Sequence, residues 1–165
     1  MYELSEFEIS AKMAKSESYV IPMETSDGSV TGINLKIVRG KEEKGFVDIF
    51  FNDKMSGKVA ASFEVRDNGV SGVIAVSDAQ TQKAVSGNIS LFTDSLSETE
   101  NSIDIKVVRV VDISAEKYLK TSFQKEDKVS SENTKDRNNV QTKRLYQVAE
   151  GFIDNIRKIF GPDNL

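Results

Sequence analysis

The segment 57–76 constrains the fold more than any other part of the chain. Val59, Ala61, Phe63 and Val65 occupy alternate positions, which is the period of a strand with one buried face. Asp67-Asn68-Gly69 follows at once, and Asn-Gly accepts the positive φ angles of a type I′ turn. The sequence therefore predicts that residues 70–76 return along the first strand as an antiparallel hairpin.

Three further segments have the same period or a related one. Apolar residues alternate in 33–37 and 47–51, and a charged loop bracketed by Gly40 and Gly45 separates these two segments. Residues 103–111 alternate at first and then become almost continuously apolar, which is typical of a strand covered on both faces. Together with the hairpin, these segments predict a mostly antiparallel sheet of about five strands.

Two segments have the period of a helix instead. Ser77 and Gln80 resemble a capping box, and a stripe of apolar residues follows at spacings of four, three and four. The stripe consists of Val85, Ile89, Phe92 and Leu96. Residues 140–160 form a stronger amphipathic pattern, which Gly161-Pro162 ends. Its apolar stripe consists of Leu145, Val148, Ala149, Phe152, Ile153, Ile156, Ile159 and Phe160.

These patterns divide the chain into four parts. Residues 1–18 are an amino-terminal extension whose spacing is compatible with a short helix, and residues 19–112 form the α+β domain. Residues 113–139 are poor in apolar residues and are predicted to be a polar linker. The linker connects the domain to the amphipathic helix 140–160.

The composition removes many kinds of chemistry. The 165 residues include no Cys and no His, which excludes thiolate nucleophiles, disulfides, and zinc sites built from Cys or His. An enzyme would have to rely on carboxylates, hydroxyls or amines. Asp104 and Asp112 cannot act as a catalytic pair, because eight residues of strand place them more than about 25 Å apart. We predict a non-enzymatic protein without a metal or cofactor.

Charge and hydropathy also narrow the range of partners. The 22 basic and 26 acidic residues leave a net charge of −4, and no glycine-rich phosphate loop occurs. Nucleic acid is therefore not an expected partner. No segment reaches the roughly 20 apolar residues of a membrane span, and the acidic start is unlike a secretory signal. We expect a cytoplasmic protein, with export in an unfolded form left open.

A family resemblance comes from the order of the predicted elements in 57–111. Two strands joined by the Asp-Asn-Gly turn, then a helix, then a closing strand form a ββαβ unit that resembles the carboxy-terminal domain of flagellar hook-length control proteins. Residues 52–59 keep the glycine and valine of that family's Pro-Glu-Glu-Leu-Gly-like segment, without the Pro-Glu-Glu. Residues 19–37 and 145–153 look like a variant of this domain from clostridial-type bacteria.

The resemblance implies a protein-binding domain that meets the cytoplasmic part of a flagellar export gate and switches its substrate specificity. The loop 53–57 would then be the contact, with Lys54, Met55 and Gly57 as partner-binding residues. Met is suited to adaptable contact surfaces. The alternative interpretation, slightly favoured by the residues alone, is that Met55 caps the core and Gly57 supplies an unusual backbone angle. It remains open whether the chain is one domain of a longer protein or a short relative. A structural or adhesive module of a bacterial surface or phage assembly is the alternative function.

Overall fold

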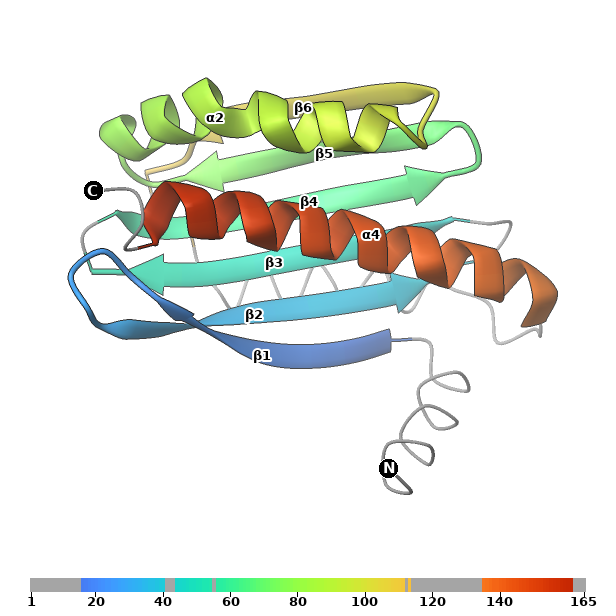
Figure 1. Cartoon of the computed structure of the whole chain (residues 1–165), viewed down its shortest axis with the longest axis horizontal. Coiled ribbons are helices and arrows are strands. Elements are labelled where there is room, and N and C mark those ends of the chain that lie inside the picture. Colours follow the sequence, from blue (N-terminus) through green and yellow to red (C-terminus); the bar gives the residue numbers. More distant parts are fainter. Residues whose placement is uncertain (1–15, 41–43, 55, 112, 114–134, 162–165) are drawn as a thin grey trace, which may run out of the picture.

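The computed structural model describes residues 16–40, 44–54, 56–111, 113 and 135–161 (Figure 1). These residues form one sheet and two helices. The strands are β1 (Ser16–Glu24), β2 (Val30–Arg39), β3 (Gly45–Asp53), β4 (Gly57–Arg66), β5 (Gly69–Val76) and β6 (Ser102–Arg109). The helices are α2 (Ala79–Ser97) and α4 (Lys135–Phe160).

The six strands lie in the sheet in the same order as in the chain. From β1 to β5 each strand pairs antiparallel with the next, whereas β6 pairs parallel with β5. A parallel pair needs a crossover connection, and α2 provides it. The α+β class is confirmed, and the prediction of about five strands is corrected to six.

The additional strand is β1. It begins at Ser16, inside the predicted extension 1–18, and residues 1–15 of that extension lie outside the described residues. The polar start Ser-Glu-Ser hid the strand. Glu17 nevertheless points to the covered face, where Tyr19 and Met23 also pack.

The predicted hairpin is present as β4 and β5. Arg66 pairs with Gly69, so the two turn residues are Asp67 and Asn68. Gly69 is required for packing instead, because a Cβ there would lie 2.2 Å from the carbonyl oxygen of Ser102 in β6. The glycine therefore allows β5 and β6 to approach at the start of their pairing.

Helix α2 begins one residue later than the predicted capping box. Its N-cap is Asp78, whose carboxylate accepts a hydrogen bond from the amide of Thr81 at 3.1 Å. The predicted stripe is confirmed, with Val85, Phe92 and Leu96 buried and Ile89 partly buried against the core.

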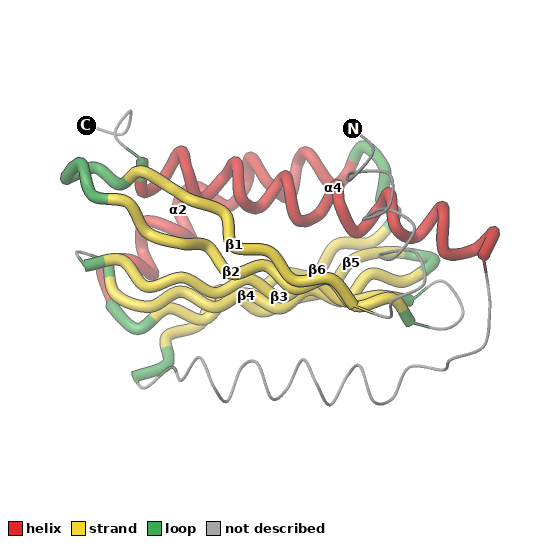
Figure 2. The backbone as a smooth tube through the Cα atoms, turned by 90° about the horizontal axis from the view of Figure 1, so that it is seen from below, coloured by secondary structure: helices red, strands yellow, loops and turns green. Residues whose placement is uncertain are grey.

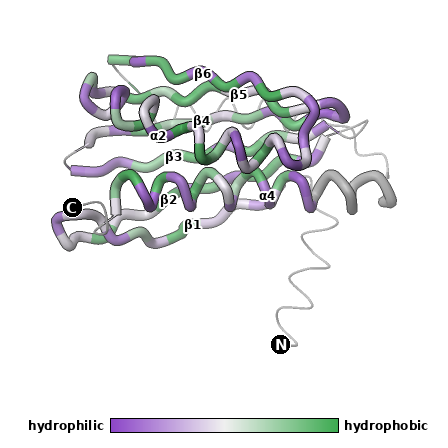
Figure 3. Tube along the Cα trace, turned by 45° about the horizontal axis from the view of Figure 1, so that its top comes forward, coloured by the Kyte–Doolittle hydropathy of each residue, from purple (hydrophilic) through white to green (hydrophobic). Residues whose placement is uncertain are grey.

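Helix α4 begins at Lys135 rather than at 140, inside the predicted linker 113–139, of which 114–134 lie outside the described residues. A helix propagates beyond its apolar stripe because each added residue contributes one more backbone hydrogen bond. All eight residues of the predicted stripe are buried. Figure 3 shows hydrophobic and hydrophilic residues alternating along this helix. Neither helix of the described chain combines the length and the apolar character needed to cross a membrane.

The two helices lie on the same face of the sheet and enclose the main core (Figure 2). At its centre Phe63 of β4 meets Phe92 of α2 and Phe152 of α4, with ring centroids 5.5 and 5.1 Å away. Such edge and tilted contacts add about 0.5–1.5 kcal/mol per pair beyond the burial of area. The predicted buried face of β4 is thus confirmed.

The last predicted strand differs most from the expectation. It ends at Arg109 rather than at 111, and Val111 is 82% exposed. Ile103, Ile105 and Val107 are only partly buried, under α2. Asp104 and Lys106 on the opposite face are exposed, so α2 covers one face of this strand and no described element encloses the other face at these residues.

Candidate partner-binding site

Four connections gather at the end of the molecule where β3 passes into β4, on the left in Figure 1. The turn between β1 and β2, the turn between β3 and β4, the start of α2 and the end of α4 all lie there. The amide of Ser26 donates to the carbonyl of Phe160 at 3.1 Å, which joins the first of these turns to the last turn of α4.

The predicted contact residues belong to the β3–β4 turn. Lys54 is exposed, whereas Met55 lies outside the described residues. Gly57 has a φ of +80°, and a Cβ at this position would lie 2.5 Å from Oγ of Ser77. Glycine is therefore required here by the backbone, as the alternative interpretation expected. A role of Gly57 in partner contact stays a prediction.

Hydrogen bonds hold this turn against the start of α2. Asp53 Oδ2 accepts from the amide of Ser56 at 2.9 Å within the turn. Thr81 Oγ1 donates to the carbonyl of Ser56 at 2.8 Å, and Ser77 Oγ accepts from the amide of Lys58 at 2.9 Å. The amide of Ser77 donates in return to the carbonyl of Lys58 at 3.1 Å. These bonds hold Asp53, Ser56 and Lys58 of the turn, and the exposed Lys54 follows Asp53 in the chain.

The neighbouring β1–β2 turn contributes a negative charge. Asp27 Oδ1 accepts hydrogen bonds from the hydroxyls of Ser29 and Thr25, at 2.6 and 2.5 Å, and from the amide of Ser29 at 3.0 Å. These bonds, with a smaller contribution from the charge of Lys54, hold the pKa of Asp27 well below its ordinary value. Asp27 therefore stays charged beside the cation across the physiological range.

The exposed side chains of the two turns form a small surface with both signs of charge, which we call the turn surface: Ser26, Asp27 and Lys54. Such a surface suits recognition of a protein partner with complementary charges. Among the described residues, no group of three or more Asp, Glu, His or Cys side chains could hold a metal ion.

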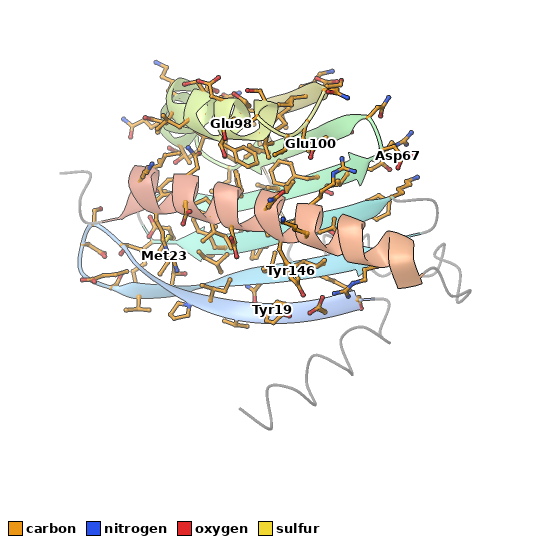
Figure 4. All side chains as sticks on the ribbon, turned by 45° about the vertical axis from the view of Figure 1, so that its right-hand side comes forward. Tyr19, Met23, Asp67, Glu98, Glu100 and Tyr146 are labelled. Carbon is orange, nitrogen blue, oxygen red and sulfur yellow. The ribbon has the colours of Figure 1, made fainter. Side chains whose placement is uncertain are left out.

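A second polar cluster lies at the opposite end and was not predicted. Glu17 of β1 and Arg39 of β2 form an ion pair whose side chains are 4% and 5% exposed. Tyr146 of α4 donates its hydroxyl to Glu17 at 2.7 Å, and Tyr19 donates to the same carboxylate. Figure 4 shows Tyr146 pointing from α4 toward the strand that carries Tyr19. We call these four residues the β1 clamp, because they tie the edge strand to α4.

The environment of the β1 clamp fixes its protonation states. Burial alone would raise the pKa of Glu17, but hydrogen bonds from Tyr19 and Tyr146 and the charge of Arg39 hold its pKa below the ordinary value. Burial and the hydrogen bonds to Glu17 raise the pKa of both tyrosines. The carboxylate is thus ionised and the phenols are neutral, which is the state in which all the hydrogen bonds form.

A third polar contact holds the other side of α4. Arg144 donates to both carboxylate oxygens of Glu100, at 3.1 and 2.5 Å, and also to the carbonyl of Arg66 at the end of β4. The carboxylate of Glu100 is 3% exposed. Paired Arg and carboxylate groups fix geometry as well as charge. Arg144 and Tyr146 thus add polar contacts to the apolar packing that holds α4 on the sheet.

The residues of the turn surface and of the β1 clamp differ in how well the sequence predicts them. Asp27 lies in Thr-Ser-Asp-Gly-Ser, a recognisable turn composition between two alternating segments. Glu17 gives no local signal, because its partner Tyr146 is 129 residues away. None of the protein-family models, curated proteins or solved structures compared with this chain matches it.

Proposed function

We propose that the chain is a non-enzymatic protein-interaction domain that binds the cytoplasmic domain of a flagellar export gate and acts in switching its substrates. Under this proposal the domain works in the cytoplasm, and the turn surface with the β3–β4 turn is the contact. The proposal joins the family resemblance of the sequence to the geometry of one end of the fold.

The observation that carries the proposal is the bracing of the β3–β4 turn by α2. Ser77 and Thr81 hold the backbone of Lys58 and Ser56 through side-chain hydrogen bonds, and Lys54 belongs to the same turn. Backbone groups that are already held do not have to be ordered when a partner docks, which lowers the entropy cost of binding. A rigid polar turn is thus a better contact than a loose one.

The order of elements also supports the proposal. β4, β5, α2 and β6 follow one another along the chain. This is the ββαβ order on which the resemblance to hook-length control proteins rests. In the fold this unit is extended by β1 to β3 on one side and by α4 on the covered face.

The test compares two lysines that differ only in place. Lys54→Glu reverses the charge of the turn surface, whereas Lys83→Glu reverses an exposed charge on α2. We expect Lys54→Glu to weaken binding to the purified cytoplasmic domain of the cognate gate at least about tenfold, or ~1.4 kcal/mol, by calorimetry. The control should bind as the unaltered chain does, and both variants should keep their thermal midpoints because both side chains are exposed.

Two results would count against the proposal. Equal losses in the two variants would show that only net charge matters and would reject the turn surface as the contact. No detectable binding by the unaltered chain would reject the export-gate function. If the chain then formed extended assemblies, the alternative of a structural or adhesive module would replace it.

A further inference from the structure

The outer edge of β6 offers a row of backbone groups to a partner strand. β6 is the last strand in the sheet, and no described residue pairs with its far side. Its eight residues, Ser102–Arg109, contain neither proline nor a bulge in their register with β5. Natural edge strands usually carry such interruptions, because an uninterrupted edge is a template for pairing with another chain.

The direction of the free groups follows from one hydrogen bond. The amide of Val110 donates to the carbonyl of Val76 in β5 at 2.8 Å. Because successive residues of a strand point their N–H and C=O groups to opposite sides, even-numbered residues of β6 face β5. Ile103, Ile105, Val107 and Arg109 therefore turn their N–H and C=O groups to the open edge.

The charged side chains of β6 would pair with those of a second β6 in one antiparallel register. If a second β6 runs antiparallel with Ile105 opposite its own copy, Asp104 lies opposite Lys106 of the other chain, and this pair occurs twice. Both side chains are exposed, and they lie on the face of the sheet away from the helices. Ile103 then lies opposite Val107 on the covered face.

Hydrogen-bond polarity selects the same arrangement. With Ile105 on the two-fold axis, the odd-numbered residues become the hydrogen-bonded pairs, and these are the residues with free groups. Asp104 and Lys106 become a non-hydrogen-bonded pair, in which side chains approach most closely. A parallel pairing in the same register would place Asp104 opposite Asp104, which is repulsive.

We propose that β6 is a dimerisation edge, where a second copy of this chain pairs antiparallel about Ile105 and continues the sheet across a two-fold axis. Charge complementarity and the direction of the free backbone groups both identify the partner as a second copy. A two-fold contact closes on itself, so it produces a discrete dimer rather than a fibre. This inference does not depend on the proposed export-gate function.

The test uses charge reversal in the full chain. Lys106→Asp puts two acidic side chains on each edge, and Asp104→Lys puts two basic side chains there. Sedimentation of the unaltered chain over a range of concentrations should show a reversible dimer, and each single variant should dimerise at least about tenfold more weakly. An equimolar mixture of the two single variants should form a heterodimer, because every pair then joins opposite charges. The double variant Asp104→Lys with Lys106→Asp should dimerise again.

Circular dichroism and thermal midpoints of the monomeric variants are the control for folding, which should not change because both side chains are exposed. A monomeric unaltered chain at every concentration would overturn the proposal. Dimers that the single reversals leave intact would also overturn it, since the contact would lie elsewhere. Growth into extended oligomers would overturn it as well, because a two-fold contact closes on itself.

Discussion

β1 and β6 are the two edges of one sheet, yet only β1 carries a proline and a charge that points inward. β1 contains Pro22, which removes one amide donor, and Glu17, a charged residue that points inward. Both features discourage pairing with a foreign strand. β6 has an unbroken alternation of apolar and charged residues instead.

The two edges differ in how much their stability depends on residues that are distant in the chain. The inward charge of Glu17 is tolerable only because Arg39 and Tyr146 satisfy it, and Tyr146 comes from α4. The protected edge therefore depends on the last helix. β6 needs no such help, since its neighbours β5 and α2 come immediately before it in the chain.

The largest effect should come from breaking the β1 clamp. Glu17→Ala leaves Arg39 buried without its carboxylate, and the loss of one partner of a buried ion pair costs about 3–5 kcal/mol. We expect the free energy of unfolding in urea to fall by this amount. Glu24→Ala on the exposed side of the same strand should change it by no more than about 0.5 kcal/mol. Similar small losses in both variants would show that the clamp does not secure the edge.

The same carboxylate should contribute to the loss of folding stability at acid pH, which we call the acid limb. Because the folded-state pKa of Glu17 lies below its ordinary value of 4.5, its contribution is complete above that value and is lost as the pH falls through the folded-state pKa. Glu17→Gln removes this group, so stability should depend less steeply on pH below 4.5 than in the unaltered chain. Glu64, whose pKa is also lowered, by hydrogen bonds from Arg66 and Lys44 that outweigh burial, supplies the control.

Glu64→Gln should also flatten the acid limb, but without the large loss at neutral pH, since its ion pairs are more exposed. Urea unfolding of the three proteins at a series of pH values measures both effects. An acid limb of unchanged slope in Glu17→Gln would mean that Tyr146 and Arg39 do not stabilise the charged form.

The spacing of apolar residues was sufficient to predict the strands and helices that bury one apolar face. Phe63 in β4 and the stripe of α4 lie on the buried faces that their spacing predicts, because burial of such a face dominates the local energetics. β1 was not counted as a strand, since it starts with Ser-Glu-Ser and the burial of Glu17 depends on Arg39 and Tyr146, 22 and 129 residues away. No local pattern contains that information.

The candidate site was predictable only in part. Gly57 follows from its place in a polar turn, and its backbone angle is confirmed. The hydrogen bonds that hold this turn could not be predicted locally. Ser77 and Thr81 are 19 and 25 residues from their partners, and the β4–β5 hairpin brings them together. The predicted cap Ser77 shows the same limit, since its hydroxyl bonds to Lys58 while Asp78 caps the helix.

The smallest effects are expected from substitutions that test which backbone N–H groups at β6 face β5 and which face the open edge. Proline substitutions at two neighbouring residues compare the two cases. Val110→Pro removes the amide that bonds to Val76 and leaves that carbonyl unpaired, at a cost of about 1–3 kcal/mol in the free energy of unfolding. Arg109→Pro removes an amide that faces the open edge, where proline is tolerated, so its cost should stay within about 0.5 kcal/mol. Both positions are exposed at the end of the strand, so side-chain burial contributes little to the difference. Urea unfolding at a concentration where the chain is monomeric gives both values. A larger loss for Arg109→Pro than for Val110→Pro would reverse the assignment of the open edge, and with it the register proposed for the dimer.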